Sequence, residues 1–378
     1  AASLQATARE APRSGIDRAD ATAAVAPARI PTAADSSFAA LVERLSEPEG
    51  YFDTDNLISN ETSYLHVIGA LERLGVTGGA YVGVGPDQNF SYMARIRPEV
   101  AFIVDVRRDN LLQHLLFKAL FEGARSRAEY LALWTGRKTP ERPDGWADAG
   151  VEELVAAVDA APASAETAED AVREVLASVL SYGLDLSAED LATIERFHRT
   201  FIRRGLDLRF TSHGRPPRFF YPTLRELILA RDLEGRRSNY LARPEDFRFL
   251  KELQAAHRVV PVVGDLAGPH ALGAIGEEAR RRGLAVSALY TSNVEFYLMW
   301  RGGRFSAFAE TVAGLPRDRR SVIIRSCFNR CASAHPRAVP GHYSTQLLQR
   351  IDDFVEGWRE GGYDGYWDLV TRESLELR

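Results

Sequence analysis

The chain has 378 residues, a formal net charge of −5, and apolar and charged fractions of 45% and 26%. These values are ordinary for globular proteins and argue against a fibrous repeat or a chain that is disordered throughout. Acidic and basic residues are interspersed, which gives no overall basic field of the kind that attracts nucleic acid. No apolar run is long enough for a membrane span, and the length predicts two structural units, such as a domain and a large insertion.

The first 36 residues are rich in Ala, Pro and Thr and have no periodic apolar face, which predicts a disordered or processed segment at 1–36. The chain begins with Ala1, which fits a removed signal peptide, a transit segment or a trimmed sequence. Two cysteines are too few for a disulfide framework and fit a reducing compartment. We therefore expect a cytoplasmic protein, with an exported or periplasmic one as the alternative.

Apolar residues at helical spacing predict N-terminal helices within 37–77, and the second of them follows the cap candidates Ser59 and Asn60. The first half of a sheet domain is expected at 78–137. It is predicted to contain strands at 80–84 and 100–106, and helices at 90–96 and from 111 to about 134.

Strand patterns are missing from 138 to 257, where capping-box candidates such as Ser187 with Asp190 and Thr223 with Glu226 predict a helical insertion. The second half of the sheet domain is expected at 258–330. Its predicted strands are 259–263, 284–290 and 321–324, and its predicted helices are 269–282 and 296–312. The last residues, 331–378, are predicted to be a helical tail.

Strands that alternate with helices of this length imply right-handed crossovers. The predicted fold is therefore α/β, with a doubly wound, mostly parallel sheet covered by helices on both faces and a large helical insertion. In such a sheet, ligands bind beyond the carboxyl ends of the strands, near the point where the strand order reverses.

That rule selects a short list of candidate residues. Gly83, Gly85 and Asp87 follow the first strand, where glycines let backbone amides approach a ligand at a helix N-terminus. Asp105 ends the second strand, where a carboxylate can accept the hydroxyls of a ribose. The remaining candidates end the third and fourth strands or precede the first: Asp265, Tyr290, Ser292, Asn293, Asn56, Asn60 and Glu61.

Each candidate also has a purely structural explanation. A glycine pair after a strand is often a tight turn, and an aspartate or asparagine there often caps a helix. The order of the candidates along the chain nevertheless favours a single nucleotide-type site.

These motifs resemble the class I S-adenosylmethionine-dependent methyltransferases, whose first motif is an acidic residue followed by Gly-x-Gly-x-Gly, with a ribose-binding acid at the end of the next strand. Gly83 and Gly85 match the first two glycines, and Asp105 matches the ribose acid. Tyr81 stands in place of the motif's acid and Asp87 in place of its third glycine. The resemblance covers about 78–135 and 258–325, and parts of these ranges also resemble an uncharacterised bacterial family.

The resemblance implies a methyltransferase-like Rossmann sandwich that binds S-adenosylmethionine and methylates a small molecule, with the insertion as a lid. It implies cofactor contacts from Gly83, Gly85, Asp87, Asp105, Asp265 and Ser292. Asn293, Tyr290 or Glu61 would orient the methyl acceptor. The alternative is a nucleotide-binding protein, non-catalytic or with an altered ligand, that keeps the fold.

Two other nucleotide ligands are less favoured by the sequence. Gln88 occupies the third glycine position of the NAD fingerprint Gly-x-Gly-x-x-Gly, and the Gly-Lys-Ser/Thr of a P-loop is missing.

Two further groups of residues leave alternatives open. Cys327, Cys331, His335 and His342 are a zinc-like set at an unusual spacing, and a disulfide or ordinary buried thiols are the other interpretations. The segment 213–221 mixes bases with aromatics, which fits either contact with an anionic or planar ligand or a loop with a buried aromatic end. Arg107 and Arg108 could meet a ligand carboxylate or phosphate, or form a solvated helix start.

Overall fold

The structure, a computed structural model, describes residues 33–142, 145–213, 215–216, 218–300 and 304–378. The predicted segment 1–36 therefore lies outside the described residues except for its last four, which begin the first helix. Within the described residues, one sheet has six strands in the order β3-β2-β1-β4-β5-β6. These strands are β1 (Ala80–Gly83), β2 (Val100–Asp105), β3 (Val259–Val263), β4 (Val286–Ser292), β5 (Val322–Cys327) and β6 (Thr345–Arg350).

The sheet is parallel except for its last strand. β1 pairs in parallel with both β2 and β4, and the parallel pairing continues to β3 on one side and to β5 on the other. β6 pairs with β5 in the antiparallel direction at the edge. The predicted α/β class with a mostly parallel sheet is confirmed, and the strand order reverses between β1 and β4.

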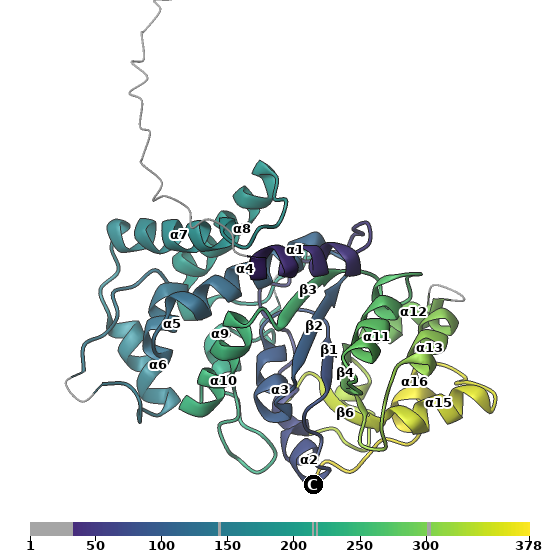
Figure 1. Cartoon of the computed structure of the whole chain (residues 1–378). Coiled ribbons are helices and arrows are strands. Elements are labelled where there is room, and N and C mark those ends of the chain that lie inside the picture. Colours follow the sequence, from purple (N-terminus) through teal and green to yellow (C-terminus); the bar gives the residue numbers. More distant parts are fainter. Residues whose placement is uncertain (1–32, 143–144, 214, 217, 301–303) are drawn as a thin grey trace, which may run out of the picture.

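Helices cover both faces of the sheet, which explains why a strand such as β2 is a continuous apolar run rather than an alternating one. One face carries α3 (Gln88–Ile96), α4 (Arg108–Gly123) and α10 (Pro244–Ala255). The other carries α1 (Ala33–Leu45), α11 (Ala271–Arg281), α13 (Arg304–Gly314) and α15 (Ile351–Arg359). Figure 1 shows the strands between these two layers.

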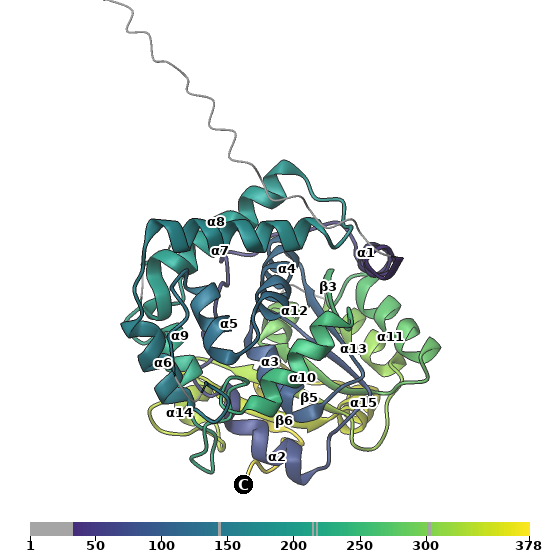
Figure 2. The same cartoon turned by 60° about the vertical axis from the view of Figure 1, so that its left-hand side comes forward.

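The helical insertion forms a further layer outside α4 (Figures 1 and 2). Two of its helices, α7 and α8, pack directly against α4. Its helices, with the α5 that leads into it, are α5 (Arg127–Trp134), α6 (Val151–Ala160), α7 (Ala165–Leu180), α8 (Ala188–Arg204), the 3-10 turn η2 (Gly205–Asp207) and α9 (Leu224–Ile228). Both predicted capping boxes are present: Ser187 with Asp190 begins α8, and Thr223 with Glu226 begins α9.

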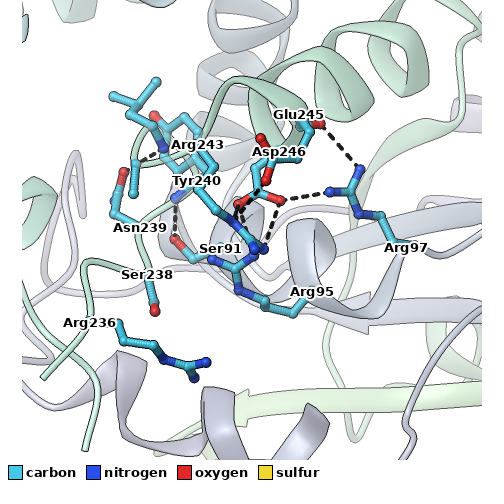
Figure 3. Close-up of polar contacts among 12 residues, drawn as sticks. Ser91, Arg95, Arg97, Arg236, Ser238, Asn239, Tyr240, Arg243, Glu245 and Asp246 are labelled. Atoms are coloured by element: carbon cyan, nitrogen blue, oxygen red, sulfur yellow. Dashed lines mark hydrogen bonds and ion pairs between the residues drawn. The ribbon is translucent and has the colours of Figure 1, made fainter. Parts of the chain in front are cut away.

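An arginine cluster fixes α10, the last helix of the segment 138–257, to α3 (Figure 3). The carboxylate of Asp246 on α10 is fully buried. It accepts hydrogen bonds from Arg95 Nη1 at 2.9 Å, Arg97 Nη2 at 2.7 Å and Arg243 Nε at 2.9 Å. Because a buried carboxylate is stable only when it is paired, these contacts tie the first half of the sheet domain to the returning chain.

The remaining elements are short: η1 (Tyr64–Val67), α2 (Ile68–Arg73), α12 (Val294–Trp300), α14 (Cys331–Ala334) and α16 (Tyr366–Thr371). The predicted helix from 111 to about 134 is two helices, because Ser126 caps a new helix by accepting a hydrogen bond from the backbone N–H of Glu129. The predicted helix 296–312 corresponds likewise to α12 and α13.

The prediction of a helical tail is wrong over β6. This segment contains two glutamines, and both are buried against partners in the structure. Gln346 Nε2 donates to the Tyr92 hydroxyl at 2.9 Å, and Gln349 Oε1 accepts from Arg325 Nη1 at 2.6 Å. Buried glutamines with satisfied hydrogen bonds make a strand look like a surface helix in the sequence.

None of the described helices is both long enough and apolar enough to cross a membrane.

Candidate functional site

A cavity of about 360 Å³ opens at the carboxyl ends of the central strands. Its walls contain residues that follow four neighbouring strands: Gly85 after β1, Asp105 at the end of β2, Asp265 after β3 and Ser292 at the end of β4. The cavity therefore lies where the strand order reverses between β1 and β4, which is the ligand position of doubly wound sheets.

Two segments outside the sheet complete the cavity. The segment before η1 contributes residues from Gly50 to Glu61, including the ring of Phe52, which lies edge-on to Tyr297 of α12 with 5.3 Å between ring centroids. The insertion contributes Phe210, Ser212, Arg215 and Tyr221. The basic and aromatic segment 213–221 thus takes part in the cavity wall, although residues 214 and 217 lie outside the described residues.

The glycine turn after β1 is shaped by a buried asparagine. Asn89 Nδ2 donates to three carbonyl oxygens of the turn, those of Val84 at 2.8 Å, Gly85 at 3.3 Å and Pro86 at 2.7 Å. Its Oδ1 accepts from the Tyr81 hydroxyl at 2.8 Å. The tyrosine that replaces the acid of the methyltransferase motif therefore orients the side chain that organises the turn.

The two glycines of this turn have different roles. A Cβ on Gly83 would lie 2.0 Å from Asn89 Oδ1, so Gly83 makes room for the asparagine and is not part of the cavity wall. Gly85 lines the cavity with φ +79°, a left-handed conformation that favours glycine. The carbonyl of Gly85 also accepts a hydrogen bond from His114 Nε2 at 2.9 Å, and burial lowers the pKa of this histidine to about 4, so it is neutral.

Asp105 lines the cavity, but its carboxylate already has a strong partner. Arg107 contacts Oδ1 through its backbone N–H and its Nε, both at 3.0 Å, and contacts Oδ2 through Nη2 at 2.8 Å. Arg107 Nη1 also donates to the carbonyls of Thr54 and Asp55, both at 2.8 Å. The predicted ribose acid is thus joined through Arg107 to the segment that roofs the cavity.

Asp265, which follows the neighbouring strand β3, is arranged in a similar way. Its carboxylate forms an ion pair with Arg304 at the start of α13, and its Oδ1 accepts from the backbone N–H of Ala267 at 2.9 Å. Its own backbone N–H donates to Glu47 Oε1 at 2.7 Å. The side chain of Asp265 is therefore shared between its own turn and α13, and it does not cap α11, which begins after His270.

Arg108, the second basic candidate beside Asp105, is not among the residues that line the cavity. It lies at the start of α4 and donates from Nε to Asp190 Oδ1 at 2.7 Å and from Nη2 to Asp190 Oδ2 at 2.9 Å. Arg108 therefore joins α4 to the capping box of α8.

Glu61 is the most enclosed acid of the cavity wall, with only 1% of the residue exposed. Its Oε1 accepts hydrogen bonds from the Tyr290 hydroxyl and from Ser292 Oγ, both at 2.5 Å, and its Oε2 contacts Ser326 Oγ at the end of β5. Burial raises the pKa of Glu61 above its usual range, against the opposing effect of these hydroxyls.

Ser292 is the cavity residue that presents a hydroxyl beside Glu61. It ends β4 with φ +52°, a left-handed conformation that is uncommon outside glycine and asparagine. Asn56, on the opposite segment, has φ +51° and also lines the cavity. Backbone conformations of this kind persist where the surrounding structure imposes them, and they cluster at binding sites.

Three of the predicted site residues do not line the cavity: Gly83, Asp87 and Tyr290. Tyr290 reaches it only indirectly, through Glu61 and through Gln88 Nε2, which donates to the Tyr290 hydroxyl at 3.1 Å. Asp87 lies on the far side of the turn, within electrostatic reach of Tyr64, Tyr130 and Tyr240. Gly83 and Asp87, which were expected to contact the cofactor, thus lie outside the set of residues that line this cavity.

Six of the predicted site residues do line the cavity: Gly85, Asp105, Asp265, Ser292, Asn293 and Glu61. The further candidates Asn56 and Asn60 line it as well. The structure also adds Gln88, whose buried Oε1 has no hydrogen-bond partner among the described residues. The carboxyl-end rule could have found Ser326 near the end of β5, but no sequence signal pointed to Asn89, Arg304 or Gln346.

The cysteine and histidine set does not form a metal site within the described residues. Cys327 and Cys331 form a disulfide, which was one of the three interpretations of the sequence. His335 Nε2 contacts the carbonyl of Val370 at 2.9 Å, and His342 Nδ1 contacts the carbonyl of Thr62 at 3.0 Å. The two cysteines therefore pair with each other, and the two histidines contact different backbone carbonyls.

Comparison with curated proteins finds no match. Residues 56–357 match the model of a family described as a domain of unknown function, DUF7790. The matched range contains all six strands, the insertion and most of the residues that line the cavity. Because the match extends over well more than half of its length, the chain belongs to the DUF7790 family.

Proposed function

We propose that this protein is a methyltransferase that uses S-adenosylmethionine to modify a small molecule. The observation that carries the proposal is the meeting of Gly85 and Asp105 on one cavity, at the carboxyl ends of β1 and β2. These are two of the three positions that match the methyltransferase motifs, and the cavity lies at the switch point of the sheet.

The size and chemistry of the cavity support this ligand class. A volume of about 360 Å³ lies within the range of roughly 300–1,000 Å³ typical of small-molecule sites. The walls combine apolar side chains such as Val84, Val104 and Leu266 with a few polar groups. When bound, S-adenosylmethionine supplies the methyl group, and the protein contributes mainly the alignment of the two reactants.

Asp105 fits the cofactor with one restriction. An ionised carboxylate has about four acceptor positions, and Arg107 occupies three of them. One position is left, so Asp105 accepts one ribose hydroxyl rather than two. Gln88 Oε1, which lacks a partner among the described residues, is a candidate acceptor for a further ligand donor.

Calorimetric titration of the purified protein tests the proposal. Binding of S-adenosylmethionine and of S-adenosylhomocysteine, with no binding of NAD, is the expected result. Binding of NAD in place of the other two would contradict the cofactor assignment.

The occupied carboxylates favour a second candidate function, a nucleotide-binding protein with an altered ligand. Both Asp105 and Asp265 are already paired with arginines that line the same cavity. If neither S-adenosylmethionine nor S-adenosylhomocysteine binds, the thermal shift of the protein should be measured with a panel of nucleotides. A nucleotide that raises the melting temperature of the wild type but not of a cavity variant would support this second function.

A further inference from the structure

Glu61 differs from the other acids that line the cavity. Asp53, Asp105 and Asp265 each form an ion pair with an arginine that also lines it, namely Arg215, Arg107 and Arg304. Glu61 takes part in no ion pair with the described residues and is surrounded by hydroxyl groups instead. An isolated charge is costly to bury, which raises the question of whether Glu61 is ionised. The hydrogen bonds of its neighbours answer that question.

The hydrogen bonds around Ser326 contain one acceptor too many for an ionised Glu61. Ser326 Oγ contacts Glu61 Oε2 and also lies 2.5 Å from Gln346 Oε1. The orientation of the Gln346 amide is fixed, because its Nε2 donates to the Tyr92 hydroxyl, which itself donates to the carbonyl of Tyr64. Ser326 has a single hydroxyl proton and can satisfy only one of its two acceptors.

A proton on Glu61 Oε2 removes this conflict. Glu61 then donates from Oε2 to Ser326 Oγ, and Ser326 donates its own proton to Gln346 Oε1. Each of the two short contacts therefore has one donor and one acceptor. The other carboxyl oxygen, Oε1, still accepts from Tyr290 and Ser292. The upward shift of the Glu61 pKa through burial acts in the same direction.

The groups around Glu61 do not supply a competing charge. The titratable side chains that face it are Tyr81 on β1, Tyr92 on α3, Tyr290 on β4 and Tyr366 on α16. Burial raises the pKa of each of these tyrosines above its usual range, so all four remain neutral. Arg325 on β5 is bound to Glu295 and Gln349.

We propose that Glu61 is a neutral carboxylic acid in the ligand-free protein and orients the hydroxyl of Ser292 as a hydrogen-bond acceptor for a ligand. Ser292 lines the cavity and donates its single hydroxyl proton to Glu61 Oε1, so towards a ligand its Oγ can only accept a hydrogen bond. The ligand class that this arrangement serves is a molecule with a hydroxyl or an amine placed against Ser292. That assignment of the ligand rests on the proposed function, whereas the proton on Glu61 does not.

Infrared difference spectroscopy of the ligand-free protein tests the inference. The spectrum of the wild type minus that of Glu61→Gln should contain the carbonyl band of a carboxylic acid at neutral pH, and the band should shift in heavy water. The matched control is Asp87→Asn, which removes the other buried acid of this region that has no ion pair among the described residues. The Glu61 band should persist in that variant.

Thermal stability provides a second measurement. In Glu61→Gln the amide can donate to Ser326 and accept from Tyr290 and Ser292, as the neutral acid does. The variant should therefore melt at the wild-type temperature in mild acid, at or below pH 4.5, where a glutamate of the unfolded chain is also largely protonated. Because a raised folded-state pKa removes stability as pH rises, the variant should become the more stable protein at higher pH. If Glu61→Gln does not fold, the carboxylic acid band of Glu61 is instead measured in Asp87→Asn over a series of pH values.

Three results would overturn the inference: a difference spectrum with only carboxylate bands at neutral pH, a Glu61→Gln variant that melts well below the wild type in mild acid, or an Asp87→Asn spectrum without an acid band. All of these measurements use protein without cofactor. A failure to bind S-adenosylmethionine would therefore overturn the proposed function without affecting the inference about the proton on Glu61. An ionised Glu61 would likewise overturn that inference without affecting the proposed function.

Discussion

Arg107 and Asp105, two positions apart at the end of β2, form a two-point ion pair whose guanidinium also binds two carbonyls of the segment above the cavity. The side chain of Arg107 is only 7% exposed. Any change at Asp105 therefore leaves a nearly buried positive charge without its partner, which affects stability as well as ligand binding.

The first prediction follows from this pair. Asp105→Ala should lower the free energy of unfolding by about 3–5 kcal/mol, the range for breaking one side of a buried ion pair. The matched control is Asp265→Ala, whose partner Arg304 is 40% exposed, and its cost should be roughly 1 kcal/mol or less. Urea unfolding of both variants measures the difference. Equal costs would show that the Arg107 pair is no more important than a surface pair.

A second prediction separates the backbone conformation of Gly85 from its place at the cavity. Gly85→Ala should reduce the affinity for S-adenosylhomocysteine, because the added Cβ lies 3.3 Å from Asn56 Nδ2 and 3.4 Å from Gln88 Nε2 in the cavity wall. Gly235→Ala is the control, since Gly235 has φ +78° and open space around its Cβ position. Both variants should lose about 1–2 kcal/mol of stability through backbone strain.

Calorimetric titration of these two variants distinguishes strain from site. Only Gly85→Ala should bind S-adenosylhomocysteine more weakly than the wild type. Equal weakening in both variants would mean that strain alone, and not the cavity wall, controls the affinity.

The third prediction concerns the asparagine that organises the glycine turn. Asn89→Ala should cost about 2–4 kcal/mol, because three turn carbonyls and the Tyr81 hydroxyl lose their buried partner. Asn110→Ala is a matched control, since Asn110 is also buried but its side-chain atoms have no hydrogen-bond partner among the described residues. That change should cost less than about 1 kcal/mol by urea unfolding. Similar costs would count against a role of Asn89 in holding the turn.

The fourth prediction is a pH dependence of stability caused by Asp87. Burial raises the pKa of its carboxyl from 3.8 to about 7. An unfolded chain ionises this group near the lower value, so the contribution of Asp87 to stability is present below that pH and is lost as pH rises towards 7. Over this interval the loss is about 4 kcal/mol.

Asp87→Asn should remove this slope. The free energy of unfolding of the wild type relative to the variant should fall between roughly pH 4 and pH 7 and stay level on either side. Urea unfolding at a series of pH values measures it. Parallel curves for the two proteins would mean that Asp87 has an ordinary pKa and is not isolated from water.

Much of the sheet could be predicted from the sequence because its strands are short apolar runs bounded by glycines or polar residues. The run at β2 and the capping boxes of α8 and α9 are local signals, and the structure follows them. The edge strand β6 could not be predicted in the same way. Its glutamines are buried only because Tyr92 and Arg325, distant in the sequence, offer hydrogen bonds.

The candidate site was partly predictable for a geometric reason. Residues that follow neighbouring parallel strands meet at one edge, and so Gly85, Asp105, Asp265 and Ser292 share a cavity. The direction of each side chain is not given by that rule. Asp87 follows the same strand as Gly85 but turns towards the tyrosines on the other side, and the arginine partners of the two aspartates come from contacts that spacing alone does not specify.

A crystal structure of the protein with S-adenosylhomocysteine tests the proposed cofactor site most directly. We expect the ligand to lie in the cavity between β1 and β4, with Gly85 beside it, one ribose hydroxyl on Asp105 and the Arg107 pair intact. Ligand bound elsewhere, or an empty cavity in protein that is saturated in solution, would contradict this site.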